Sequence, residues 1–209
     1  MIADEAALKR SVEQLSSPQI WVDCRVIAAG DELALLPEEA ESIASHAPHV
    51  RRASGAARIA GRALLARLGL PDHAIPKSAS GAPVWPDGVL GSFAHEQEVA
   101  VAAVARSGDI AALGIDVEPA EPLPSELQAL VLTKREQAQL PRASWSGRLV
   151  FAAKEAVYKA IAALDGTLLD YQDIETDLSA GRAITDGRCL TLRYSTSPRL
   201  IVLAFIERS

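Results

Sequence analysis

The amino-acid sequence predicts an α+β fold built in two parts. Apolar residues make up 49% of its 209 residues, which is enough to bury a substantial core. Each half contains one long segment with the helical spacing of apolar residues, and strand-like segments follow it. We therefore expect an N-terminal lobe, 1–108, and a C-terminal lobe, 109–209, with a seam near residues 105–115.

In the first half the helical pattern is clearest over 49–68. It ends before Gly69 and Pro71, a combination that is typical of a helix C-terminus. Pro37 precedes two glutamates, as in the first turn of many helices. The elements expected in this half are helices at 3–15, from 37 and at 49–68, strands at 20–28 and 99–105, and a loop rich in proline and glycine at 71–91.

In the second half the strongest helical pattern covers 145–163. An apolar strand over 110–117 is ended by Glu118 and Pro119, because proline cannot donate to a strand ladder. The other elements expected in this half are helices at 125–132 and 136–140 and strands at 173–177, 189–194 and 200–206.

The charge balance limits the classes of partner. The chain has 21 Lys and Arg against 27 Asp and Glu, a net charge of −6, and only 4% aromatic residues. A nucleic-acid or anionic-membrane binder needs a positive field, and single-stranded nucleic acids stack on aromatic side chains. We therefore expect no nucleic-acid or membrane partner.

The first residues and the cysteines indicate the compartment. Asp4 and Glu5 stand where a signal peptide carries basic residues, and no apolar run is long enough to span a bilayer. Cys24 and Cys189 are far apart in sequence, so we expect two reduced, buried thiols, with one disulfide as the alternative. These features predict a cytoplasmic protein.

Two carboxylates share one face of a predicted strand. In Gly-Ile-Asp-Val-Glu, residues 114–118, side chains alternate, so Asp116 and Glu118 project together. Like charges at such a position repel each other, and a bound divalent cation would remove the conflict. Oxygen ligands favour Mg²⁺ or Mn²⁺ over zinc. The alternative is a pair of solvated acids at a strand end.

A third carboxylate and two lysines lie on the predicted helix over 145–163. Glu155 and Lys159 are neighbours one turn apart, and Lys154 lies beside Glu155 on the helix. The simplest interpretation is a surface ion pair. Together with Asp116 and Glu118, however, the segment provides what a metal-bound phosphoanhydride requires, namely oxygen ligands for the metal and ammonium groups for phosphate.

Two further segments carry polar groups that suit an anion. The glycine- and proline-rich loop runs into His95, which is either a ligand-binding residue or a hydrogen-bonded core histidine, and Trp85 within the loop is expected to be a packing anchor. Arg51, Arg58 and Arg62 share one face of the predicted helix over 49–68. That face is either solvated or a local anion site.

Taken together, these segments resemble the phosphopantetheinyl transferases of the Sfp and EntD type. Residues 114–118 and 151–159 look like the two signature motifs of that family. Residues 81–92, running into His95, are similar to a third motif that characterises the siderophore-associated EntD branch. The resemblance covers about residues 50–180.

The resemblance implies a fold and a metal site. Members of the family have two similar α+β lobes related by pseudo-twofold symmetry, with coenzyme A in the cleft between them. By resemblance, Asp116, Glu118 and Glu155 would hold Mg²⁺, and the pyrophosphate of coenzyme A would complete its ligands.

The resemblance also implies a set of cations for coenzyme A. The histidine of this set would bind the 3′-phosphate, and two of the lysines would contact phosphate. The implied residues are Arg51, Arg52, Arg58, Lys77, His95, Lys154 and Lys159. The chain departs from the family at Ala94, where a Ser or Thr is usual, and at 54–57, where small residues replace bulky ones.

The activity implied is the transfer of the 4′-phosphopantetheine arm of coenzyme A to a serine of an apo acyl or peptidyl carrier protein, releasing 3′,5′-adenosine bisphosphate. Glu155 is the expected base, acting directly or through a metal-bound water, and Lys159 would neutralise charge on the leaving phosphate. A siderophore assembly line is the favoured source of the carrier, and a monomer is expected. The expected docking surface is 119–140, with apolar contacts from Leu127, Leu130, Val131 and Leu132.

Two other functions use the same residues. A Mg²⁺-dependent nucleotide-diphosphate hydrolase would need the same acids and cations, but no carrier protein. A non-catalytic coenzyme A-binding module would have no need of three clustered acids. The products formed with and without an apo carrier separate these functions.

Overall fold

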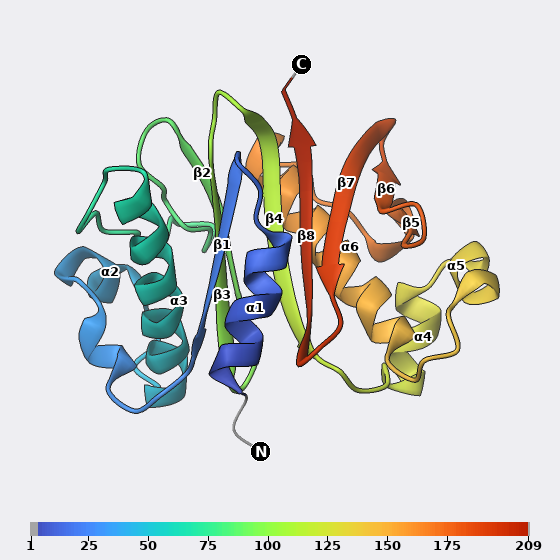
Figure 1. The fold of residues 1–209 in the computed structure, drawn as a ribbon, viewed down its shortest axis with the longest axis horizontal. Helices are drawn as coiled ribbons and strands as arrows, with labels where there is room; N and C mark the ends of the chain where they lie inside the picture. The colour runs from blue at the N-terminus through green and yellow to red at the C-terminus, as the bar shows by residue number, and fades with distance from the viewer. Residues whose placement is uncertain (1–3, 209) are drawn as a thin grey trace.

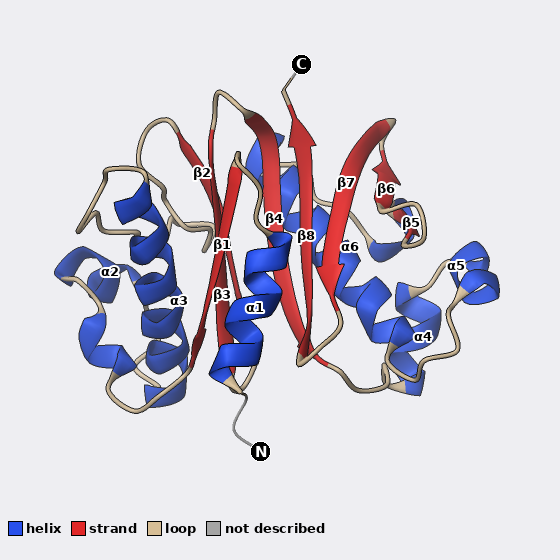
Figure 2. Cartoon of the chain, viewed as in Figure 1, coloured by secondary structure: helices blue, strands red, loops and turns tan. Residues whose placement is uncertain are grey.

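In the computed structural model, residues 4–208 form two antiparallel β-sheets covered by helices (Figure 1, Figure 2). The first sheet has the order β1-β3-β2, and the second has the order β4-β8-β7-β6-β5. The strands are β1 Ile20–Val26, β2 Val89–His95, β3 Val99–Arg106, β4 Ile110–Pro119, β5 Glu175–Asp177, β6 Arg182–Thr185, β7 Arg188–Ser195 and β8 Arg199–Glu207. The fold is therefore α+β, as the sequence predicts.

Three long helices cover the sheets. The helices are α1 Glu5–Leu15, α2 Pro37–Ser42, α3 Pro48–Arg67, α4 Ser125–Val131, α5 Lys134–Gln139 and α6 Ser146–Asp165, with short 3₁₀ turns η1 Asp31–Ala34 and η2 Tyr171–Asp173. In Figure 1, α1 lies across the face where the two sheets meet, α3 covers the first sheet and α6 covers the second. Each long helix thus buries a different sheet face.

Side chains alternate between the two faces of the central strands, so one strand contributes to two apolar clusters. On β3, Val99 and Val101 pack under α1, while Ala102 and Val104 point to the opposite face, towards α3. On β8, Leu203 likewise packs under α1. Alternating side chains of β8 on the other face, Leu200, Val202 and Ala204, join α6. Both faces of each central strand are covered, so these strands read as continuous apolar runs.

The helices predicted from periodicity are all present, within a few residues of their expected ends. Two strands escaped prediction. The strand β2 contains Gly91, and a Cβ there would lie 2.4 Å from Cε2 of Trp85, so glycine is needed for the indole to pack. Trp85 is the packing anchor that the sequence predicts, with its ring 4.8 Å from that of Phe93. The strand β6 is only four residues long.

Both cysteines are free thiols, as expected. Cys24 is buried on β1, and loss of solvent raises the pKa of its thiol to about 12. Cys189 is exposed, contrary to the expectation that both are buried, because its side chain points away from α6 on β7. Within residues 4–208, none of the helices combines the length and apolarity that a membrane span requires.

A close helix–sheet contact lies at Gly114 on β4. A Cβ built there would lie 2.0 Å from the carbonyl oxygen of Ala156 and 2.8 Å from the amide nitrogen of Ala160, both on α6. These are backbone atoms, so no side-chain movement relieves the clash. Gly114 therefore sets the distance between the strand and the helix that carry the candidate acids.

We expect Gly114→Ala to lower the free energy of unfolding by about 3 kcal/mol, because α6 must move away from β4. In a chain of this length, that corresponds to a fall in Tm of roughly 10 °C, measurable by calorimetry. Gly108→Ala is the matched control, since a Cβ there meets no atom within 4 Å. Equal Tm values for the two variants would contradict this account of the contact.

Candidate functional site

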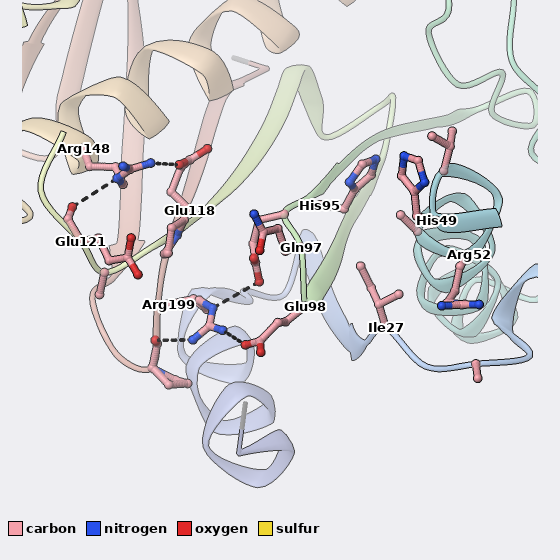
Figure 3. A pocket seen from close by; sticks show the side chains of 17 residues that line it. Ile27, His49, Arg52, His95, Gln97, Glu98, Glu118, Glu121, Arg148 and Arg199 are labelled. Atoms are coloured by element: carbon pink, nitrogen blue, oxygen red, sulfur yellow. Dashed lines mark hydrogen bonds and ion pairs between the residues drawn. The ribbon is translucent and has the colours of Figure 1, made fainter. Parts of the chain in front are cut away.

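A cleft of about 1,040 Å³ lies where the two halves of the chain meet. Its first wall includes Ile27 after β1, His49 and Arg52 on α3, and the turn between β2 and β3 (Figure 3). The opposite wall is the end of β4 with Glu118, the first turn of α6, and the start of β8. Of the three candidate acids, Glu118 lines this cleft.

Asp116 is the most buried of the three acids, with only 6% of its surface exposed. Its Oδ1 accepts a hydrogen bond from Nζ of Lys159 at 2.7 Å, and that Nζ also donates to the carbonyl oxygen of Ile115 at 3.1 Å. Its other oxygen, Oδ2, is buried and has no hydrogen-bond partner within residues 4–208. A buried carboxylate oxygen without a partner is costly, and such an atom suits a cation ligand.

The electrostatics of Asp116 confirm that the acids are close enough to interact. Burial raises the pKa of Asp116 to about 7, Lys159 opposes that rise, and the negative charges of Glu118 and Glu155 add to it. Glu118 and Glu155, the other two acids predicted as a set, therefore act on the buried Asp116.

Glu118 is held by an arginine that the sequence analysis missed. Nη1 of Arg148 donates to Oε2 of Glu118 at 2.8 Å. The same guanidinium donates to the backbone carbonyl of Glu121 at 3.2 Å (Figure 3). It also donates to the backbone carbonyl of Pro122, at 2.9 Å. Arg148 thus ties the first turn of α6 to the end of β4 and the connector after it.

Glu155 is held by a tyrosine that the sequence analysis also missed. The hydroxyl of Tyr171 donates to Oε1 of Glu155 at 2.6 Å. Burial raises the pKa of Tyr171, and the hydrogen bond to Glu155 raises it further, so the phenol stays protonated. Both residues line a smaller pocket of about 450 Å³ beside α6.

The donor set fits a hard divalent cation. Three carboxylates with coupled charges, one of them bearing an unpartnered oxygen, are the ligands that Mg²⁺ and Mn²⁺ prefer. As the side chains stand in residues 4–208, no three acidic, His or Cys groups enclose a metal position. Each carboxylate is instead bound to Lys159, Arg148 or Tyr171.

Two lysines and a histidine, from both halves of the chain, affect one another's surroundings. The pKa of His95, at the end of β2, is lowered by loss of solvent and then by the positive charges of Lys159 and Lys77. Loss of solvent, followed by the charge of Arg58, lowers the pKa of Lys77. Lys77 and Lys159 therefore both lie near enough to His95 to favour its neutral form, and two lysines beside a histidine can bind an anion.

The arginines of α3 are arranged differently from the prediction. Arg52 lines the cleft beside His49 and pairs with Glu32 at 3.2 Å. Arg51 only reaches the carbonyl of Ala40, at 3.4 Å.

Arg58 and Arg62, expected on an exposed face, are held against the body of the protein. Arg58 is 2% exposed and donates to the carbonyls of Ile75 and Ser54, although its Nη2 has no partner among the described residues. Arg62 binds both carboxylate oxygens of the buried Glu39 at 2.7 Å. The aligned arginines therefore mainly anchor the α2 segment and the loop before β2.

Lys154 is the clearest departure from the predicted site. Its side chain is fully buried and forms an ion pair with Glu136 at 2.8 Å. Its Nζ also donates to the carbonyls of Val131 and Tyr171, at 2.8 and 2.7 Å. With all its donors used inside the protein, Lys154 does not face the cleft, and its assignment to phosphate is wrong for this structure.

Some of the residues that the prediction missed have a sequence pattern that could have identified them, and others have none. Arg148 lies two helical turns before Glu155, so the spacing alone could have placed it on the same side of α6. His49 precedes Arg52 by three residues on the same helix. Arg199 pairs with Glu96 and Glu98 across the cleft. No local sequence pattern indicates Arg199 or Tyr171, because the partners of both residues are distant in sequence.

Comparison with known proteins gives matches along most of the chain. The model of the 4′-phosphopantetheinyl transferase N-terminal domain matches residues 38–105, and that of the 4′-phosphopantetheinyl transferase superfamily matches residues 112–199. The two matches together include every candidate site residue named above.

Several curated proteins are similar. The 4′-phosphopantetheinyl transferase Svp of Streptomyces mobaraensis is 43% identical over 71% of this chain and 63% of its own length. The 4′-phosphopantetheinyl transferase PptT of Mycobacterium tuberculosis is 34% identical over 76% of each chain. Enterobactin synthase component D of Salmonella typhimurium is 35% identical over 38% of this chain and 35% of its own. The chain thus spans just under two thirds of the Streptomyces protein.

The position of Lys154 leads to a stability prediction. Lys154→Met leaves Glu136 buried without its cation, so we expect a loss of about 3–5 kcal/mol and a fall in Tm of more than roughly 6 °C. Lys9→Met, which removes an ion pair from a far more exposed lysine, should cost under about 1 kcal/mol. A Lys154→Met protein as stable as the wild type would mean that the lysine is not needed inside the fold.

Proposed function

The chain belongs to the 4′-phosphopantetheinyl transferase superfamily, and from this premise we propose that it transfers the 4′-phosphopantetheine arm of coenzyme A to a serine of an apo carrier protein. The observation that supports the proposal is a region around the buried Asp116, which Lys159 binds and on which the charges of Glu118 and Glu155 act, beside a cleft lined by Glu118 and His95. Such a region can bind a pyrophosphate and catalyse attack on it.

We propose that coenzyme A lies in this cleft, between lobes that correspond to residues 1–108 and 109–209 and are related by pseudo-twofold symmetry. The arrangement of α3 on one sheet and α6 on the other supports this division. Lys77, His95 and Lys159 are the cations that we assign to the phosphates, with Arg52 and His49 at the rim of the cleft. Lys154 is left out of this set because it is buried.

Asp116, Glu118 and Glu155 are the residues that would hold Mg²⁺. A bound magnesium ion would supply charge stabilisation for the phosphates during transfer. The free Oδ2 of Asp116 supports this assignment. For Glu118 and Glu155, the hydrogen bonds to Arg148 and Tyr171 use one oxygen each, which leaves the other oxygen of each carboxylate for the ion.

In the reaction we propose, the carrier serine oxygen forms a bond to the β-phosphorus of coenzyme A. The bond from that phosphorus to the bridging oxygen breaks, and 3′,5′-adenosine bisphosphate leaves with the electron pair. Glu155 accepts the serine proton, because a neutral hydroxyl is a poor nucleophile. Lys159, already oriented by Asp116 and the carbonyl of Ile115, stabilises negative charge on the phosphates.

The carrier must reach Glu155, which limits where it can dock. Of the apolar residues expected on the docking surface, Val131 and Leu132 are buried, so that part of the expectation is wrong. Leu130 is 51% exposed, and Leu168, on the rim of the pocket that contains Glu155, is 78% exposed. We propose that these two leucines contact the carrier on either side of the Tyr171 segment.

We expect the partners to be acyl or peptidyl carriers, and the similarity to enterobactin synthase component D supports a siderophore assembly line. We propose a monomer that works in the cytoplasm without nucleic-acid or membrane partners. The same cleft would serve a nucleotide-diphosphate hydrolase or a coenzyme A-binding module. Incubation with coenzyme A, Mg²⁺ and an apo carrier separates the three, because only a transferase adds one phosphopantetheine group to the carrier mass.

We expect Glu155→Gln to reduce transfer by about 10²- to 10⁴-fold, since the amide cannot accept the serine proton. Intact-mass analysis of the carrier measures the rate. Glu13→Gln, an exposed change on α1, should transfer at the wild-type rate. Transfer by a folded Glu155→Gln protein at the wild-type rate would remove Glu155 from the proposed role.

The docking surface is tested by Leu130→Asp combined with Leu168→Asp. Replacing exposed apolar contacts by charge should raise KM for the carrier by about tenfold or more, while KM for coenzyme A stays constant. Leu33→Asp is the control, because Leu33 is 84% exposed on η1, in the other half of the chain. If the double variant has the wild-type KM for the carrier, docking occurs elsewhere.

A further inference from the structure

Within residues 4–208, Tyr171 is the one side chain that donates a hydrogen bond to Glu155, the proposed base. We propose that Tyr171 is a positioning residue, which fixes the Glu155 carboxylate by donating its hydroxyl to Oε1 and so presents Oε2 to the reacting groups. This inference rests on the proposed function of Glu155.

The hydrogen bond has the geometry of a strong contact. Its length of 2.6 Å lies in the range of bonds from a hydroxyl to a charged carboxylate. Within residues 4–208, no other side chain donates to Glu155. Only one carboxylate oxygen is engaged, so the bond restricts the rotation of the side chain without using up its second oxygen.

Tyr171 is itself held at two points by α6. Its carbonyl oxygen accepts a hydrogen bond from Nζ of Lys154 at 2.7 Å. Its ring packs on Phe151, with 5.7 Å between ring centroids and 44° between their planes. Phe151 and Glu155 are one helical turn apart, so the ring rests on one turn while the hydroxyl reaches the next.

The support for Tyr171 continues into the core of the C-terminal half. Lys154 is held by the buried carboxylate of Glu136 at 2.8 Å. The other oxygen of Glu136 accepts from the backbone and the hydroxyl of Thr176 on β5, at 2.8 and 2.6 Å. A connected set of polar contacts therefore runs from β5 through Lys154 and Tyr171 to the carboxylate of Glu155.

Lys154 and Glu155 are adjacent in sequence but have different roles in this set of contacts. Adjacent helical residues point about 100° apart, so one side chain enters the core while the other faces the pocket. The lysine fixes the backbone of the tyrosine, and the tyrosine fixes the acid. A network in which every member is satisfied holds one geometry more firmly than isolated pairs do.

The test is Tyr171→Phe, which removes the hydroxyl and keeps the ring against Phe151. Mn²⁺ titration of the free protein, followed by electron paramagnetic resonance, measures the affinity of the acids directly. We expect the Kd for Mn²⁺ to rise about tenfold, as for loss of other residues that orient metal ligands. In the transfer assay, kcat should fall about tenfold while KM for coenzyme A stays at the wild-type value.

Tyr194→Phe is the matched control, since within residues 4–208 the hydroxyl of Tyr194 donates only to the carbonyl of Leu178, and Tyr194 lines a pocket beside α1 that does not contain Glu155. It should leave the Mn²⁺ affinity and kcat unchanged. Tyr171→Leu, which also removes the ring, should lower Tm below that of Tyr171→Phe. This comparison separates the packing of the ring from the action of the hydroxyl.

Unchanged Mn²⁺ binding by Tyr171→Phe would overturn the proposal. Tighter Mn²⁺ binding would overturn it too, because it would mean that the tyrosine competes with the metal for Glu155. An unchanged kcat would overturn it as well. If the wild-type protein transfers nothing to the carrier, the proposed function fails, and the Mn²⁺ titration still decides whether Tyr171 orients Glu155. If the wild-type protein does not bind Mn²⁺, the proposal that Tyr171 positions Glu155 for a metal is wrong.

Discussion

The contact between β4 and α6 at Gly114 governs the geometry of the whole site. Because a Cβ would lie 2.0 Å from the carbonyl of Ala156, only glycine lets the helix approach this closely. The helix meets the strand with small residues, including Ala152, Ala156 and Ala160, which are fully buried. At this distance Lys159 reaches Asp116, and the abundance of alanine in α6 follows from the same requirement.

That close approach also brings like charges of the candidate acids near one another, and each acid has its own hydrogen-bond partner. Burial raises the pKa of Asp116 to about 7, and the negative charges of Glu118 and Glu155 add to the rise. Each acid has one cation or hydroxyl as partner: Lys159, Arg148 or Tyr171. The net charge of −6 therefore says little about the cleft, where cations from both halves gather beside the acids. An overall acidic composition is compatible with a local phosphate site.

Features that depend on local periodicity could be predicted from the sequence. The direction of a side chain could not be predicted where a residue distant in sequence determines it. Lys154 and Lys159 illustrate the difference. Both follow from the helical pattern, yet their directions differ by about 140° round the helix, and only the position of Glu136 on another helix determines which lysine turns inwards. The strand β2 was missed for a similar reason, because Gly91 looks like a loop residue until the indole of Trp85 is packed on it.

The width of the cleft depends on contacts between the halves that lie outside the catalytic groups. The hydroxyl of Ser92 on β2 accepts a hydrogen bond from the amide of Ile115 on β4, at 3.2 Å, directly beside Asp116. At the far end, Arg199 of β8 binds Glu96 and Glu98 in the turn that follows His95 (Figure 3). These two links join β2 and the turn after it to the second sheet. Because His95 lies between them, its distance from Asp116 is set by the backbone of two sheets, and a ligand that contacts both residues meets a preformed site.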